Sequence, residues 1–170
     1  QPAIVSANTA VTTVVAPPPP STSWIPSAGG SYDWNLAGNW NPAGVPNAVG
    51  MIAIQNNDLS GNQTIHLNSA ITLGEAVLGD SSGSQTTTLR NGGAGSLAFD
   101  QTDSSIAYLT RTAGGTGTVT LASDLGVSLM DDLTARLASG TATIRIDGSI
   151  SGTGKGITVD GGELTLALSG

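Results

Sequence analysis

The chain has 170 residues, which is enough for one ordinary domain with a buried core. It contains 24 glycines but one phenylalanine and two tyrosines, and only 10% of its residues are charged. Such a composition is typical of tightly wound β structure rather than of the varied interior of an enzyme. Five basic residues against twelve acidic ones give a net charge of -7, which excludes a basic surface for nucleic acid.

Two further absences bear on the class of protein. Cysteine is missing, which excludes disulfides, thiolate metal sites and thiol nucleophiles. No run of 18 apolar residues occurs, so we expect no membrane span. The chain opens on Gln1 and Pro2 instead of Met, which favours a processed, secreted protein.

Residues 1–20 form an uncharged, β-prone arm that ends in four consecutive prolines, Pro17 to Pro20. The prolines favour an extended polyproline conformation and cannot join the interior of a sheet. Two interpretations are open: a disordered leader, or a strand donated to the exposed sheet edge of a neighbouring subunit. We take strand donation as the working hypothesis. Its apolar contact residues would be Ile4, Val5, Val11, Val14 and Val15.

Residues 21–50 contain a cluster of aromatic residues: Trp24, Tyr32, Trp34 and Trp40. One interpretation is a platform on which sugar rings stack. The other is a cap, in which large rings close the open end of a coil of strands and shield the first rung, or turn of the coil, from water. We favour the cap.

From residue 51 onward, short runs of alternating apolar residues are separated by glycine and polar turns, which predicts short half-buried strands. The predicted strands are centred on Met51–Ile54, Thr64–Leu67, Ala70–Leu73, Ala76–Leu78, Thr86–Arg90, Ser96–Phe99, Ile106–Leu109 and Thr116–Leu121. Residues Ser123–Ser139 also carry leucines every fourth position, a helical spacing. Helix and strand both stay open there, with strand favoured.

The last stretch, residues 141–170, shows the alternation most clearly. Glycine turns separate its apolar positions, which are Ile144, Ile146, Ile150, Ile157, Val159, Leu164, Leu166 and Leu168. Strands this short are not stable alone, but stacked turns of a coil bury a continuous aliphatic column and pair their backbones. Leu164, Leu166 and Leu168 would form an uncapped final rung that can recruit another strand.

The same stretch resembles a known family. Residues 148–170 are similar to the autotransporter-associated β-strand repeat, and residues 34–56 resemble the tryptophan-rich segment often found ahead of such repeats in secreted bacterial surface proteins. The positions that fit the repeat are Ile150, Gly152, Gly154, Val159, Gly161, Gly162, Leu164, Thr165, Leu166, Ser169 and Gly170. The family continues into many repeats, whereas here only one is clear. Either the chain is a fragment, or another copy supplies the next strands.

No residue pattern points to catalysis. His66, the sole histidine, lies in a predicted strand without partners nearby in sequence, and Lys155, the sole lysine, lies in a glycine turn where a covalent cross-link is conceivable but a surface turn is the simpler interpretation. The carboxylates of Asp100, Asp103 and Glu163 are scattered. We therefore expect no enzyme activity, metal or cofactor.

Together these observations predict an all-β chain: a β-solenoid, with a right-handed parallel β-helix as the favoured form. We expect an extended arm with a proline-rich linker at 1–20, an aromatic cap at 21–50 and the solenoid at 51–170. The expected function is that of an extracellular structural subunit on the bacterial surface that polymerises head to tail by strand addition. The alternative is an adhesin or glycan-binding stalk module of a larger surface protein.

Overall fold

The computed structural model describes residues 20–112, 114–138 and 143–167. These residues form β-strands and two short 3₁₀ helices, η1 (Ala37–Asn39) and η2 (Thr102–Ser104), and contain no α-helix. The apolar arm residues Ile4, Val5, Val11, Val14 and Val15, together with Leu168, lie outside the described residues. The all-β prediction is confirmed.

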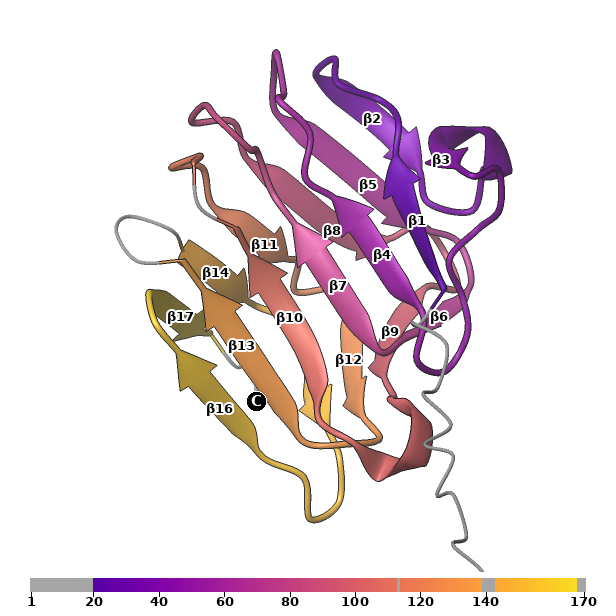
Figure 1. Ribbon diagram of the computed structural model, residues 1–170, viewed down its shortest axis with the longest axis vertical. Coiled ribbons are helices and arrows are strands. Elements are labelled where there is room, and N and C mark those ends of the chain that lie inside the picture. The colour runs from indigo at the N-terminus through magenta and orange to yellow at the C-terminus, as the bar shows by residue number, and fades with distance from the viewer. Residues whose placement is uncertain (1–19, 113, 139–142, 168–170) are drawn as a thin grey trace, which may run out of the picture.

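The strands lie in three sheets, here named A, B and C, and Figure 1 shows neighbouring strands running side by side. Sheet A contains β3 (Trp40–Asn41), β1 (Ser21–Trp24), β4 (Ile52–Gln55), β7 (Glu75–Leu78), β10 (Ala107–Arg111), β13 (Leu133–Leu137) and β16 (Ile157–Asp160). Sheet B contains β2 (Gly30–Asp33), β5 (Gln63–Leu67), β8 (Thr87–Asn91), β11 (Val119–Leu121), β14 (Thr143–Ile146) and β17 (Glu163–Leu166). Sheet C contains β6 (Ala70–Leu73), β9 (Ser96–Phe99), β12 (Gly126–Leu129) and β15 (Ile150–Ser151).

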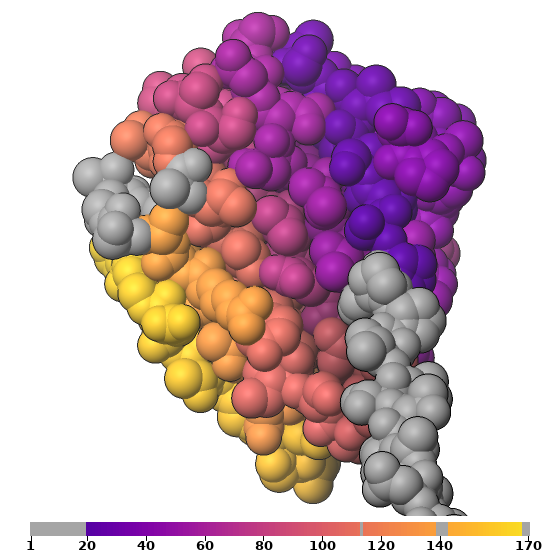
Figure 2. Space-filling view, viewed as in Figure 1, coloured from indigo at the N-terminus to yellow at the C-terminus, as the bar shows by residue number. Residues whose placement is uncertain are grey.

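Each strand from β4 onward pairs in parallel with the strands three places earlier and three places later in the chain where these exist, except that β6 does not pair with β3. Consecutive strands from β4 onward therefore lie in sheets A, B and C in turn. Among the described residues, the one antiparallel pair is β1 with β3, and no sheet closes on itself, because each has two separate edge strands. On the surface, the chain advances in adjacent bands from the N-terminal side to the C-terminal side (Figure 2).

The inward-facing side chains of the three sheets make a single core, in columns that follow the strand register. One column on sheet B runs through Ile65, Leu89, Leu121 and Ile146, all of which are fully buried. One on sheet A runs through Ala53, Ala76, Leu109 and Ala135, also fully buried. Alternation of buried and more exposed residues along strands β4 to β14 produces these columns, as expected for period-two side-chain geometry.

Two expectations from the sequence meet clear outcomes. The described residues 123–138 contain strands β12 and β13 and no helix, in agreement with the favoured prediction for this segment. The segment expected to be only a cap also supplies strands: β1 pairs in parallel with β4, and β2 with β5. The parallel sheets therefore begin near residue 21 instead of residue 51.

Candidate functional site

The three tryptophans pack together at the N-terminal end of the core. Trp34 and Trp40 have ring centroids 4.7 Å apart, and Trp24 and Trp40 are 4.9 Å apart, both pairs edge to face. All three side chains are buried, with exposed fractions of 0 to 2%. Their indole N–H groups donate to the carbonyl oxygens of Pro46 and Trp34 and to the side-chain oxygen of Gln63.

This packing leaves no indole face free for a sugar ring. Tyr32, which is only partly buried, contacts the edge of Trp24, and its hydroxyl donates to the carbonyl oxygen of Ala28. The arrangement favours the cap interpretation over the glycan platform.

At the same end, backbone N–H and C=O groups on the outer edges of two sheets find hydrogen-bond partners in two different ways. Strand β3 covers the outer edge of β1 in sheet A. In sheet C, the side-chain amide of Asn47 takes the place of a strand: it accepts a hydrogen bond from the backbone N–H of Thr72 and donates to the carbonyl oxygen of Ala70. The outer edges of sheets A and C at this end are thus covered, by β3 and by Asn47. The outer edge of β2 in sheet B has no strand partner among the described residues.

The opposite end of the core is different. Within residues 20–112, 114–138 and 143–167, no strand pairs with the outer edges of β15, β16 and β17. Val159 continues the sheet A column but is 47% exposed, and Leu166 continues the sheet B column but is 43% exposed. Every earlier aliphatic member of these two columns is fully buried. The last strands therefore present apolar side chains and unpaired backbone groups together, which is the chemistry of a strand-accepting edge.

The open edges include apolar residues beyond those that the sequence analysis assigned to a subunit contact. Leu164 and Leu166 were expected at this end, and the structure places both on β17. The sequence analysis did not assign Ile157 and Val159 of β16 to the contact surface, although their alternation was visible. Strand β16 is the last strand of sheet A, just as β17 is of sheet B, so both edges are open.

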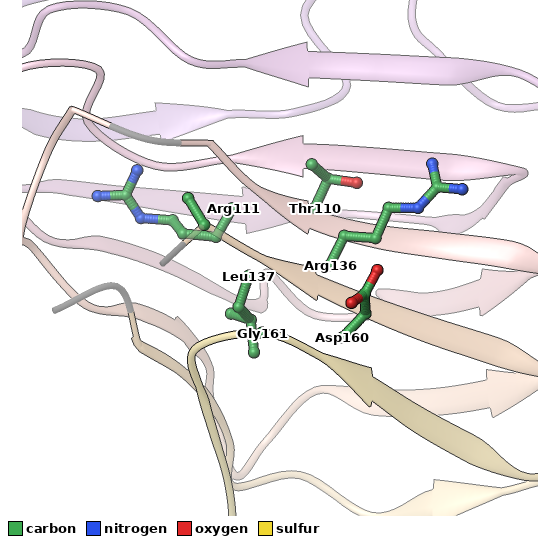
Figure 3. A pocket seen from close by; sticks show the side chains of 7 residues that line it. Thr110, Arg111, Arg136, Leu137, Asp160 and Gly161 are labelled. Carbon is green, nitrogen blue, oxygen red and sulfur yellow. The ribbon is translucent and has the colours of Figure 1, made fainter. Parts of the chain in front are cut away.

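A surface hollow of about 380 Å³ lies beside β10, β13 and β16 (Figure 3). It is lined by Thr110, Arg111, Arg136, Leu137, Ala138, Asp160 and Gly161. The guanidinium groups of Arg111 and Arg136 extend away from it in opposite directions, as Figure 3 shows. Arg136 stacks over the ring of Tyr108 at 3.3 Å. The hollow therefore lacks the convergent polar groups that a small-molecule site needs.

Arg111 and Asp80 are fully buried and have structural partners. Arg111 donates to the carbonyl oxygens of Asp80 and Gly117. Burial lowers the pKa of Arg111, and the attraction of the Asp80 charge, which raises this pKa, only partly offsets the effect. Burial raises the pKa of Asp80, but backbone N–H donors, led by those of Leu59 and Gln85, outweigh burial and hold its pKa below the usual value. Together these two side chains fix the connections between sheets A and B.

The other candidates have ordinary roles. His66 contacts the hydroxyl of Ser31 at 3.0 Å on the outer face of sheet B. The amine of Lys155 lies 3.4 Å from a carboxylate oxygen of Asp131, as an ion pair. Within the described part of the chain, no three metal-ligating side chains come together, and no helix has the length and apolar character to cross a bilayer.

Searches of protein-family models, curated proteins and solved structures found no match. The resemblance to autotransporter-associated repeats therefore stays a prediction that depends on the residues quoted for it.

Proposed function

We propose that the chain is a β-solenoid, coiled as a right-handed parallel β-helix, that serves as an extracellular structural subunit of the bacterial surface. The pairing of each strand with the strand three places away supports a coil of three strands per turn. The resemblance of residues 34–56 and 148–170 to autotransporter-associated repeat proteins supports the location. The low content of charged residues and the many glycines fit a structural role.

Assembly into a head-to-tail fibre is the proposed activity, and the exposure of Val159 and Leu166 is the observation that carries it. Both side chains occupy core columns. Further β-strands, one beside β16 in sheet A and one beside β17 in sheet B, would bury them and pair the open backbone edges. Because this contact joins two different surfaces of the subunit, it does not close on itself and propagates as a filament.

The donated strand in this proposal is the N-terminal arm of a second copy. Residues 1–16 are uncharged and β-prone, and Pro17 to Pro20 form a spacer between arm and body. At the N-terminal end of the same molecule, β3 occupies the edge of sheet A and Asn47 closes the edge of sheet C, which leaves only the edge of β2 as an acceptor there among the described residues. The open edges of a neighbouring molecule are the better acceptor.

Negative-stain electron microscopy of the full chain and of a variant lacking residues 1–16 tests the proposal. We expect filaments from the full chain and folded monomers from the truncated one. Equal filaments from both proteins would refute donation by the arm.

A matched pair of double variants tests the acceptor end. Val159→Ser with Leu166→Ser removes apolar surface from the open edges and should abolish filaments. Ile25→Ser with Leu36→Ser removes two side chains of similar exposure, 53% and 57%, away from those edges and should leave filaments unchanged. Loss of filaments in both pairs would point to general surface hydrophobicity instead.

The same open edges also favour a second candidate, a stalk module of a larger adhesin. In that case further strands of the same polypeptide would cover β16 and β17. The chain would then be monomeric with or without residues 1–16 and would bind glycans on an array. Loss of that binding in Trp34→Ala at unchanged thermal stability would assign it to the aromatic cluster, whereas a variant that unfolds would support the cap.

A further inference from the structure

Sheet B begins with β2 and ends with β17, and Figure 1 shows these two strands at opposite ends of the molecule. Among the described residues, no strand pairs with the outer edge of either one. All neighbouring strands of sheet B are parallel, so β2 and β17 run in the same direction. We infer that β17 of one copy pairs in parallel with β2 of the next copy, so that sheet B continues across the contact.

The inference rests on the proposed head-to-tail assembly and names the partner of β17. In sheet A the outer edge of β1 is covered by β3, and in sheet C the outer edge of β6 is covered by Asn47. Neither sheet can therefore continue directly into the same sheet of the next copy. Strand β16 is left to the donated arm.

The backbone groups on the two outer edges are complementary. In sheet B, the N–H after each core-column residue donates to the carbonyl oxygen of the column residue before it, at 2.8 or 2.9 Å: Ala122 to Leu89, Asp147 to Leu121 and Ala167 to Ile146. Backbone groups of successive residues in a strand point to opposite sides, so the N–H and C=O of Leu166 point away from β14. On β2, the N–H groups of Gly30 and Trp34 donate toward β5. Those of Ser31 and Asp33 therefore point to the outer edge.

The inferred register sets Leu166 opposite Tyr32 of the next copy. The N–H of Asp33 then donates to the carbonyl oxygen of Leu166, which repeats the hydrogen-bond pattern of sheet B. The N–H of Leu166 donates in turn to the carbonyl oxygen of Ser31. The core column of sheet B thus continues from one copy into the next.

Shifted registers fit less well. A shift by one residue turns the apolar side chains to the outer face. A shift by two residues in one direction sets Leu164 opposite Tyr32. The N–H of Leu166 would then point to the carbonyl oxygen of Asp33, which already accepts a hydrogen bond from the Asn39 side-chain amide at 2.8 Å. The opposite shift by two pairs only one residue of β17 with β2.

Apolar side chains meet on the inner face in the inferred register. Tyr32 begins the sheet B column but is only partly buried, and Leu166 ends it at 43% exposure, whereas the members between them are fully buried. Gly30, which has no side chain, would lie opposite Leu164. A Cβ at Gly30 would lie 3.9 Å from the Tyr32 ring, so the ring lies close to this position. Leu164 and Leu166 of one copy would both pack on the ring.

Charged side chains do not oppose the contact. Asp33 of the next copy would lie opposite Ala167, and Glu163 would lie opposite Gly29 of the next copy. No two carboxylates are therefore directly paired, which would be unfavourable on neighbouring strands.

The cap makes successive copies tilt. Strand β3 and the arm would lie between β16 of one copy and β1 of the next, whereas no strand separates β17 from β2. One extra strand spacing of about 4.8 Å in sheet A, across sheets about 10 Å apart, corresponds to a tilt of about 25° toward sheet B, and the arm increases it. We therefore expect curved filaments with sheet B on the inner side of the curve.

Disulfide trapping between two copies tests the pairing, and the chain contains no cysteine that could interfere. A tagged Ser31→Cys protein is mixed with an untagged Thr165→Cys protein under oxidising conditions. The Cα atoms of these two positions would be directly paired, about 4.8 Å apart and within disulfide range. The matched control mixes Ser31→Cys with Glu163→Cys, which lies two residues out of register on the same face and beyond about 7 Å.

We expect the mixed covalent dimer to form with Thr165→Cys at a yield at least tenfold above that with Glu163→Cys, and filaments in negative stain to be curved. Equal yields, or a dimer only in the control mixture, would overturn the pairing of β17 with β2. Filaments with neither cross-link, or straight filaments, would also overturn this pairing but leave the proposed assembly intact. Absence of filaments and of both cross-links would overturn the assembly as well.

Discussion

Replacing Trp34 by Ala should strongly destabilise the N-terminal cap. Its side chain is fully buried, packs against Trp40 and donates to the carbonyl oxygen of Pro46. A buried tryptophan removes about 150–250 Å² from water, which at about 25 cal/mol per Å² corresponds to about 4–6 kcal/mol as an upper value. Measured truncations of this kind cost about 3–5 kcal/mol. We expect a loss in the free energy of unfolding within that range.

Urea denaturation followed by circular dichroism and tryptophan fluorescence measures this loss. Because stacked coils unfold partly by local steps, the first strands should unfold at lower urea than the rest in the variant. Trp34→Phe retains most of the ring and should lose less than half as much. If Trp34→Ala changed stability by less than about 1 kcal/mol and instead removed binding to glycans, the cap assignment would be wrong.

Three further changes probe the body of the molecule. Gly95→Ala would drive its Cβ into a backbone carbonyl of β5 and should cost several kcal/mol, whereas Gly44→Ala, which meets open space, should cost less than about 1 kcal/mol in the same melts. Arg111→Ala leaves two buried carbonyl oxygens without their donor and should lower the free energy of unfolding by about 3 kcal/mol or more. Arg136 is exposed and stacks on the ring of Tyr108, so Arg136→Ala should cost only about 1 kcal/mol. Because the pKa of Asp80 is depressed in the fold, its stabilisation is present above the unfolded-state value near 3.9 and lost as pH falls through the folded value. Asp80→Asn should therefore have a lower free energy of unfolding at neutral pH than the unchanged protein and should lose less of it on acidification. If the free energy of unfolding fell with pH by the same amount in both proteins, this expectation would be contradicted.

Alternating apolar residues predicted most of the strands. Ala70–Leu73 and Ser96–Phe99 were predicted with the bounds that the structure gives them, because glycine and polar turns mark both ends. At Ser123–Ser139 the leucine spacing also fitted a helix, but the observed burial alternates with period two along β12 and β13. Period-two burial and the parallel partners on either side decided in favour of strands.

Strands β1 and β2 were not predicted, because their sequences do not alternate apolar with polar residues. The inward positions of β1 are Thr22 and Trp24, and those of β2 are Gly30 and Tyr32. Buried polar side chains such as Gln63 could not be predicted for a related reason. Its four partners come from residues distant in sequence, so only the assembled fold satisfies it.

At the candidate site, the sequence predicted the apolar positions of β17 but not the contribution of β16. Alternation identifies a strand without telling whether a later strand will cover it. Only the order of strands within each sheet shows this, and that order places Val159 on the last strand of sheet A. The burial of the tryptophans likewise depends on the contact between β1 and β3.

The connections from sheet A to sheet B vary in length from turn to turn, down to Gly161 and Gly162 alone between β16 and β17, whereas those from sheet B to sheet C are all short. Asn68 and Ser69 alone separate β5 from β6, and Gly74 alone separates β6 from β7, whereas residues 56–62, 79–86 and 112–118 link sheet A to sheet B. Inserted sequence at the short corners would break the strand register, but the long corner already accepts variation. The exposed positions of these connections are the natural place to graft a foreign epitope for display, provided that the buried Asp80 and Arg111 and their partners are kept.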